Sequence, residues 1–302
     1  DIAAALDDAV AKYGFRITEH QVEADSAAPR ICAVFSDDLA RSGVDYASFV
    51  QLPKAGLSVE AEANQLCVAG LVHGERYALT FRKGLPSATK ETLAKDVTIT
   101  AYVRDRGPAV TFPGRAYILP KGEDSGLPVQ TVNTEHLALK LLRVSDRNLV
   151  ASMQRDYFAR SLDQWDAGNL EDALAQTVWT GTADVGMQVN RDVTTRLPVQ
   201  EVTGPLGPGV YVLSASIPGA DPYEHPPATQ WFVISDLGLT SFSGTDGLTV
   251  AVRGLSDAKA VAGATVTLVS RANAVIGSAT TDAEGVAHFD PALAAGAGNA
   301  AP

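Results

Sequence analysis

Apolar and polar positions alternate along much of the chain, as they do in half-buried antiparallel β-strands. In the segment GERYALTFRKGL, Tyr77, Leu79 and Phe81 alternate with small or polar residues, and KDVTITAYVRD repeats the pattern. Two shorter apolar runs, ICAVF and QLCVAGL, come before them, and Gly and Pro residues separate the runs as they do at turns. This pattern predicts a small β-sandwich that extends to about residue 104.

The first residues of the chain follow a different period. Ile2, Leu6, Val10 and Tyr13 recur at spacings of four, four and three, which places them on one face of an α-helix. We therefore expect a short helix in front of the first β-sandwich.

A second segment runs from about residue 105 to residue 230 and again contains strand patterns, in AYILP, VQTVN and HLALKLLRV. The alternation stops between about residues 148 and 176, where Leu149, Met153 and Tyr157 lie at helical spacings, as do Leu170 and Leu174. This interruption predicts one or two helices inserted into a sandwich and ending at Gln176. In GVYVLSASI both sets of alternate positions are mostly apolar, which is typical of a strand buried on both faces.

A third segment, 231–302, is dense in strand patterns, and the Pro-rich stretch PGADPYEHPPAT before it predicts a semi-rigid linker or an exposed loop. The expected fold is mostly β, with tandem antiparallel β-sandwich domains at 1–104, 105–230 and 231–302. The first includes the N-terminal helix and the second the inserted helices. We expect residues from about Ala292 onward to lie on the surface and the last sandwich to be incomplete at its C-terminus.

The stretch SATTDAEGVAHFDP in the third segment contains the acidic residues of a calcium loop. An EF-hand needs oxygen ligands at alternate positions and a glutamate at the twelfth. Counted from Asp282, the fifth position is Val286 and the twelfth is Leu293, so the ligand pattern fails. We predict instead a β-hairpin corner in which Asp282 accepts backbone N–H groups and Gly285 adopts a positive φ.

The chain has two cysteines, Cys32 and Cys67, each inside an apolar run, and neither has a Cys or His at a metal-ligand spacing. They could be two buried thiols that only pack in the core. They could also form a disulfide that joins two strands of one small domain, which is the interpretation we favour. A disulfide would indicate an oxidising compartment.

Composition excludes several classes of function. The formal net charge is −11 without a basic cluster, so nucleic acid and anionic lipid surfaces are not expected partners. No apolar run reaches the roughly 20 residues that a membrane-spanning helix needs. The chain opens at Asp1 rather than at Met, so we expect a processed protein or an expressed segment.

Enzyme motifs are also missing from the sequence. There is no G-x-S-x-G elbow and no phosphate-loop spacing, and adjacent carboxylates such as Asp37 and Asp38 are typical of a solvated face. The tryptophans could form a platform for a sugar, although Trp179 and Trp231 lie in strand-like runs, where core packing is expected. We therefore predict no catalytic, cofactor-binding or metal-binding residues and no cofactor. The histidines lie far apart, without ligand partners two to four residues on: His20, His73, His136, His225 and His288.

The chain resembles the bacterial alpha-2-macroglobulin family over nearly its whole length after the leading helix. The third segment is similar to a macroglobulin-type β-sandwich in WFVISDLGLTSFSGTDGLTVAVRGL and GATVTLVSRANAVIGSATTDAEGVAHFD. The first is similar to the family's amino-terminal module in ICAVFSDDL, CVAGLVHGERYALTFRKGLP and ETLAKDVTITAYVRDR. The second is similar in FPGRAYILPKG, GLPVQTVN and GVYVLSAS.

This resemblance implies the N-terminal structural segment of a periplasmic protease trap, whose parent protein is often lipid-anchored. Family members present a bait region to proteases, and many capture them through a Cys–Gln thioester. Neither Cys32 nor Cys67 has a Gln three residues on, so we expect this segment to have no chemistry of its own. We also expect it to be a monomer. The implied partners are proteases, through the parent's bait region, and other cell-envelope proteins. The alternative is a cell-envelope adhesin or carbohydrate-binding module, since tandem β-sandwiches also serve that purpose.

Overall fold

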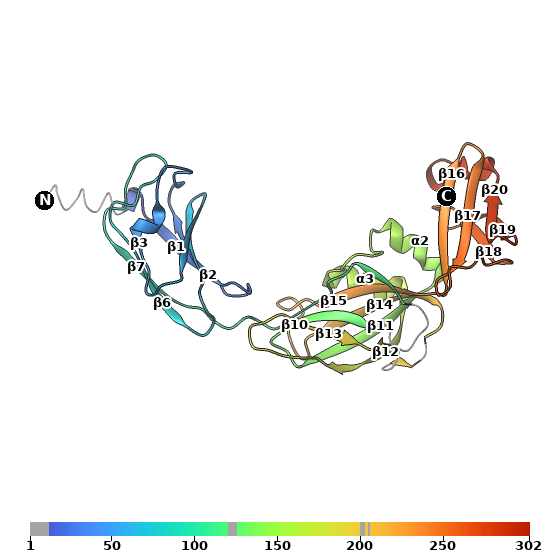
Figure 1. Ribbon diagram of the computed structural model, residues 1–302, viewed down its shortest axis with the longest axis horizontal. Helices are drawn as coiled ribbons and strands as arrows, with labels where there is room; N and C mark the ends of the chain where they lie inside the picture. Colours follow the sequence, from blue (N-terminus) through green and yellow to red (C-terminus); the bar gives the residue numbers. More distant parts are fainter. Residues whose placement is uncertain (1–11, 120–125, 200–202, 205) are drawn as a thin grey trace. The chain divides into compact units, whose positions relative to one another are not determined.

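The computed structural model describes residues 12–119, 126–199, 203–204 and 206–302. It is mostly β, which confirms the predicted fold class (Figure 1). The chain divides into two compact units: the first comprises Asp1–Gly107 and Gln188–Asp192, and the second comprises Pro108–Met187 and Val193–Pro302. The N-terminal helix was predicted on residues that largely lie outside the described ones, and only Lys12 and Tyr13 are seen in helical conformation.

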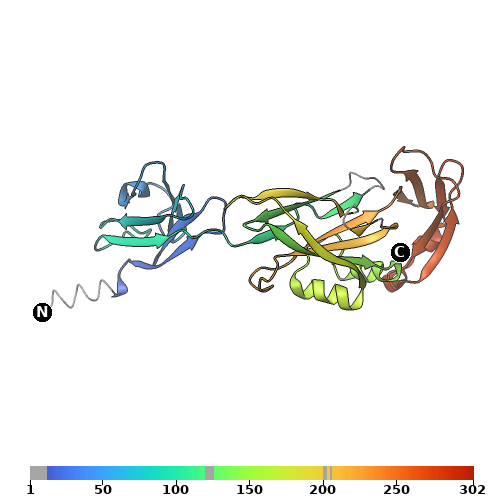
Figure 2. The ribbon, with the colours of Figure 1, turned by 90° about the horizontal axis from the view of Figure 1, so that it is seen from below.

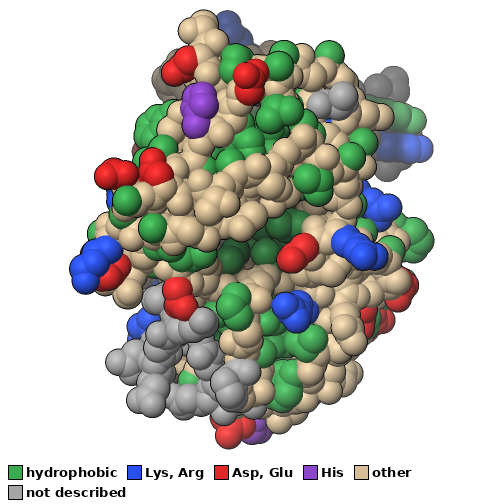
Figure 3. Space-filling view, turned by 90° about the vertical axis from the view of Figure 1, so that its right-hand side faces the viewer, with side chains coloured by type: hydrophobic (Ala, Val, Ile, Leu, Met, Phe, Trp, Pro, Cys, Tyr) green, Lys and Arg blue, Asp and Glu red, His purple; other side chains and the backbone are tan. Residues whose placement is uncertain are grey.

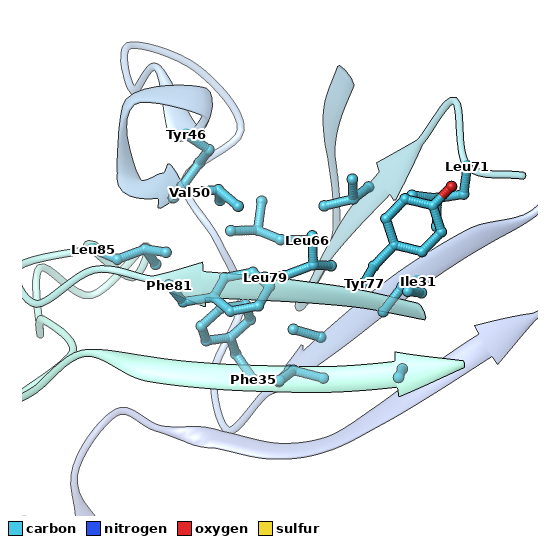
Figure 4. Close-up of a cluster of buried hydrophobic side chains, with 14 of the residues drawn as sticks. Ile31, Phe35, Tyr46, Val50, Leu66, Leu71, Tyr77, Leu79, Phe81 and Leu85 are labelled. Atoms are coloured by element: carbon cyan, nitrogen blue, oxygen red, sulfur yellow. The ribbon is translucent and has the colours of Figure 1, made fainter. Parts of the chain in front are cut away.

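The first unit contains two antiparallel sheets, ordered β1-β2-β5-β4 and β3-β6-β7. Figure 4 shows the core of this unit, where Phe35 and Leu66 from one sheet lie near Leu79 from the other. Tyr77, Leu79 and Phe81 are all buried, as their alternation predicted. The strands are β1 Ile17–Glu23, β2 Arg30–Phe35, β3 Val50–Gln51, β4 Ser58–Glu62, β5 Gln65–Ala69, β6 Arg76–Phe81 and β7 Val97–Tyr102.

The second unit begins with a three-stranded sheet, β13-β10-β8, and a five-stranded sheet, β12-β11-β14-β15-β9. All pairings in these sheets are antiparallel except that of β9 with β15. The strands are β8 Ala109–Thr111, β9 Ala116–Leu119, β10 Leu127–Val132, β11 His136–Val144, β12 Ala175–Asp184, β13 Val193–Leu197, β14 Gly209–Ser216 and β15 Ala228–Ile234.

The five-stranded sheet has a hydrophobic core on each face. On β14, Tyr211 and Leu213 belong to one core, and Val212 belongs to the other, beneath the helices. This arrangement confirms the prediction of a strand buried on both faces. Figure 2 shows the helices α2 (Asp146–Gln154) and α3 (Gln164–Ala173) together on one side of the strands.

The helices differ in detail from the prediction. α3 ends at Ala173 and β12 begins at Ala175, so the predicted end at Gln176 is wrong by three residues. Met153 was expected on the apolar face of α2 but is 50% exposed. Tyr157 is buried in the core, but it follows the end of α2 and a residue with positive φ, Asp156. Its helical spacing from Leu149 is therefore not the reason for its burial.

The Pro-rich stretch is a loop between the paired strands β14 and β15 rather than a linker between domains. β15 continues to Ile234, and its Trp231 and Phe232 pair with Val212 and Tyr211. The boundary predicted after residue 230 therefore cuts through a strand. In other respects, the division of the chain into three domains stays a prediction.

The rest of the second unit forms a three-stranded sheet, β16-β17-β20, and a two-stranded sheet, β18-β19. Its buried core is small and consists of Val250, Val252 and Phe289, with half-buried apolar residues around it. Figure 3 views this side of the molecule, where hydrophobic side chains gather in a hollow. The elements are β16 Leu237–Gly244, β17 Gly247–Gly254, β18 Thr265–Val269, β19 Val275–Thr280, β20 Val286–Phe289 and α5 Pro291–Ala294.

The described side chains after Pro291 are exposed or half-buried, as predicted for this stretch. Leu293 is half-buried because it packs against the small core. No helix among the described residues is long and apolar enough to cross a membrane.

Candidate functional site

A disulfide joins the two cysteines in the first unit. Cys32 on β2 and Cys67 on β5 are directly paired across the strands, their Cα atoms are 3.9 Å apart, and their sulfurs are bonded. Both residues are fully buried. The bond therefore links the two central strands of the first sheet, and it leaves this chain without a free thiol.

A network of charged residues holds the segment 188–192 within the first unit. Arg106 donates two hydrogen bonds of 3.1 Å to the carboxylate of Asp192 and another to the backbone carbonyl of Asp25. Arg104 donates to the Asp25 carboxylate. These arginines lower the pKa of each carboxyl group through the hydrogen bonds that they donate. The arrangement is structural, because every charged group in it has a partner.

The histidines serve separate local contacts. A ring nitrogen of His73 lies 2.8 Å from the carbonyl of Ala24, and one of His225 lies 2.9 Å from the carbonyl of Pro108. His136 contacts Asp184 at 2.8 Å on the surface. Within the described part of the chain, no three His, Cys, Asp or Glu side chains are grouped so that they could hold a metal ion.

The acidic loop of the third segment forms the predicted hairpin corner. The Asp282 carboxylate accepts hydrogen bonds from the backbone N–H groups of Glu284 and Val286, at 3.0 and 2.8 Å. Gly285 has a φ of +73°, and a Cβ at this position would lie 2.7 Å from the carbonyl oxygen of Val252. The hairpin therefore requires the aspartate for its own turn, and the glycine both for its positive φ and for the close approach of β17.

A cleft of about 680 Å³ lies between α3 and the five-stranded sheet. Its charged residues are already paired: Lys140 Nζ donates to both carboxylate oxygens of Glu171, at 3.0 and 2.8 Å. Thr177 donates a further hydrogen bond of 3.0 Å to the same carboxylate. The bond from Lys140 lowers the pKa of Glu171, and partial burial opposes this shift. The charged residues of this cleft therefore serve the contact between α3 and the sheet.

A second cleft, of about 430 Å³, lies between α3 and the Pro-rich loop. Two aromatic side chains on its wall are highly exposed, Trp165 at 79% and Tyr223 at 86%. Asp163 and Asp172 also line this cleft, and Gln164 and Gly168 line both clefts. The residues of the second cleft used below are Asp163, Gln164, Trp165, Gly168, Asp172 and Tyr223. We name this cleft the α3–loop cleft and take it as the candidate functional site.

The structure does not bring the three tryptophans together. Trp231 is buried and packs edge-on against Phe158, with ring centroids 5.3 Å apart. Trp179 is half-buried on β12 and packs against the core of the second unit. Of the three tryptophans, only Trp165 is largely exposed. The α3–loop cleft was not predicted from the sequence, because the Pro-rich stretch was expected to be either a linker or an exposed loop and neither interpretation placed it beside α3.

The fold and these sites define a modular protein of antiparallel β-sandwiches. The family model of the bacterial alpha-2-macroglobulin MG2 domain matches residues 111–232, and the model of the MG3 domain matches residues 234–302. Together these matches cover well over half of the chain. The chain belongs to the bacterial alpha-2-macroglobulin family, which confirms the resemblance found in the sequence.

Known relatives agree with this assignment. Alpha-2-macroglobulin of Escherichia coli K12 is 27% identical over 207 residues, which are 68% of this chain but only 12% of that protein. A crystal structure of the native E. coli protein spanning domains MG0-NIE-MG1 is 23% identical, with a TM-score of 0.53, and the alignment covers 91% of this chain and 90% of that one. A crystal structure of a Salmonella alpha-2-macroglobulin mutant is 21% identical, with a TM-score of 0.62, over 94% of this chain and 17% of that one. At these identities the structural likeness shows the fold alone.

Proposed function

We propose that this chain is the N-terminal structural segment of a bacterial alpha-2-macroglobulin-like protease inhibitor, a protease trap of the periplasm. The observation that carries the proposal is the pair of consecutive family-model matches to MG2 and MG3 domains. The chain spans about an eighth of the length of the curated E. coli relative, so the trapping activity is proposed for a longer parent protein.

The local chemistry supports a structural role for this segment. Two of its ion pairs, Arg106–Asp192 and Lys140–Glu171, serve local contacts. Its cysteines are bonded to each other, so they are not available for a thioester or for capture of a protease. We therefore assign no catalytic step to this segment, and we expect the bait and capture regions to lie elsewhere in the parent protein.

The disulfide supports a periplasmic location, because such bonds persist in oxidising compartments. Lipid anchoring of the parent protein is part of the same proposal. Fractionation of the native host tests it: the parent protein should be released with the periplasm, or with detergent if it is anchored. Recovery in the cytoplasm with both cysteines reduced would contradict the location.

Inhibition assays test the function. The full-length parent protein should block cleavage of large protein substrates by a protease while small peptide substrates are still cleaved, because a trapped protease remains active towards molecules that can reach it. The segment 1–302 alone should block neither reaction. Inhibition by the segment alone, or no inhibition by the parent protein with any of several protease classes, would refute the proposal.

A second candidate function is a glycan-binding module of the cell envelope. The exposed side chains of Trp165 and Tyr223 are the observation that favours it, because exposed aromatic rings offer apolar faces on which sugars stack. A glycan array with the segment 1–302 distinguishes the two functions. Reproducible binding of a sugar would support the module, and its loss in Trp165→Ala would assign the α3–loop cleft to it.

A further inference from the structure

One face of α3 forms a wall of the α3–loop cleft. Trp165, Gly168, Asn169 and Asp172 follow one another at spacings of three, one and three residues, so their side chains share one face of the helix. The opposite wall is Tyr223 with its neighbouring prolines. An exposed aromatic residue therefore stands on each side of the cleft.

The cleft is formed by restrained elements. The Asp163 carboxylate caps α3 by accepting a hydrogen bond of 2.8 Å from the backbone N–H of Asp166. Across the cleft, Asp221 accepts hydrogen bonds from the backbone N–H groups of Tyr223 and His225, at 2.9 and 2.8 Å. Prolines within this loop further limit its backbone. A ligand that enters the cleft therefore meets walls that are already ordered.

Gly168 has no structural explanation within the described residues. It lies in the middle of α3, where glycine is less favourable than alanine because it increases the entropy lost on folding. A Cβ at this position would meet no atom within 4 Å. Neither a close contact nor a positive φ requires glycine here. The missing side chain does, however, keep the centre of the cleft wall open.

The charges in the cleft are unbalanced. The described residues that line it include the carboxylates of Asp163 and Asp172 and no Lys, Arg or His. Among the described residues, Asp172 makes no hydrogen bond or ion pair, whereas Glu171 beside it is paired with Lys140. A cation would therefore find an unpaired carboxylate in a cleft that two aromatic side chains also line.

One residue of the cleft wall also carries an unused hydrogen-bond acceptor. Gln164 Oε1 is buried and has no hydrogen-bond partner among the described residues, and Gln164 lines the cleft. A buried acceptor without a donor is unfavourable, so a ligand that supplies N–H groups would be stabilised here.

From these features we infer that the α3–loop cleft binds an arginine side chain on an extended segment of a partner protein. The guanidinium group is planar and stacks on aromatic rings, and its N–H groups match carboxylate and amide oxygens. A neutral sugar would also stack on Trp165, but it would leave the charges of Asp163 and Asp172 uncompensated. This binding role goes beyond the proposed protease-trap function and does not depend on it.

The test uses the chain 1–302 and a capped heptapeptide with one arginine between glycine and serine residues. The matched probe replaces arginine with citrulline, which has nearly the same shape but no charge. Binding is followed by NMR through the three tryptophan indole N–H signals, with buried Trp231 as the internal reference. The arginine peptide should shift the Trp165 signal in a saturable way, and the citrulline peptide should bind at least about tenfold more weakly.

Two variants locate the binding. Gly168→Leu should abolish the shift, because its side chain fills the cleft while Trp165 stays as the reporter. Asp172→Asn should weaken binding several-fold, and Asp257→Asn, which removes the same charge outside the cleft, should leave it unchanged. An unchanged Trp231 signal shows that each variant is folded.

Several outcomes overturn the inference. Equal binding of the two peptides would show that the charge of the guanidinium group does not contribute to binding. Equal effects of Asp172→Asn and Asp257→Asn would show that the peptide is attracted only by the overall negative charge of the protein. Binding that survives Gly168→Leu, or no shift at millimolar peptide, would exclude the cleft. A shift of Trp165 with neutral oligosaccharides but not with the arginine peptide would assign the cleft to glycans instead. None of these outcomes bears on protease inhibition by the parent protein.

Discussion

Reduction of the Cys32–Cys67 bond is expected to destabilise the first unit by about 4 kcal/mol. The bonded residues are 35 positions apart, and the loss of loop-closure entropy in the unfolded chain increases with the logarithm of this separation. Both cysteines are fully buried on paired central strands, so the bond also holds the registration of β2 with β5. Measured losses for native disulfides of small domains are about 2 to 5 kcal/mol, which brackets this value.

The assay compares unfolding of the whole chain in urea with and without a reductant, after the bond has been reduced in the unfolded state. All three tryptophans, Trp165, Trp179 and Trp231, lie in the second unit, so tryptophan fluorescence reports that unit and serves as the internal control. Hydrogen exchange of peptides from β2 and β5 reports the first unit. Reduction should remove most of the protection in β2 and β5 and leave the fluorescence transition unchanged.

A double variant, Cys32→Ala with Cys67→Ala, provides the matched control, because the reductant should have no effect on it. The reasoning is wrong if reduction lowers the opening free energy of β2 and β5, as derived from hydrogen exchange, by less than about 1 kcal/mol. Such a change lies below the range known for native disulfides. It is also wrong if the unfolding free energy of the second unit, from fluorescence, falls as much as the opening free energy of β2 and β5. The bond would then stabilise more than the unit that contains it.

Four further changes test other parts of the structure. Gly168→Ala should stabilise the second unit by about 0.5 to 1 kcal/mol in fluorescence-monitored urea unfolding, because nothing lies near the added methyl group, and a loss of stability would contradict this. Gly285→Ala should destabilise the same unit by about 1 to 3 kcal/mol, because the hairpin needs a positive φ and a close approach to a backbone oxygen; an unchanged urea midpoint would refute it. Arg106→Gln should increase hydrogen exchange in residues 188–192, since the arginine side chain is only 10% exposed and holds Asp192 through two hydrogen bonds; unchanged exchange there would count against that role. The lowered pKa values of Asp25 and Asp192 should make the first unit lose stability on acidification. This stabilisation is complete above the unfolded pKa of about 4 and disappears as the pH falls through the lower folded pKa. An opening free energy of that unit, derived from hydrogen exchange, that stays constant from pH 5 to 2 would refute this prediction.

The sequence by itself determined the strands and which of their faces are buried. Tyr77, Leu79 and Phe81 were assigned to the core correctly because side chains of a strand point alternately to its two faces. This alternation can be recognised from residues that are adjacent in the sequence. The hairpin corner at Asp282 and Gly285 was also predictable, since both interactions are made within a few residues of the chain. The family resemblance also rested on short stretches of sequence.

Tertiary structure decided which strands pair and which exposed residues meet. β15 pairs with both β14 and the distant β9, and this pairing makes the Pro-rich stretch a loop within one sheet rather than a linker. Met153 shows the same limit, because helical spacing identifies residues on one face but not the surface that the face contacts. Trp165 and Tyr223 line one cleft although they are far apart in the sequence. Such contacts depend on how whole elements pack, and the hydrophobic pattern of a single element carries no information about its partner.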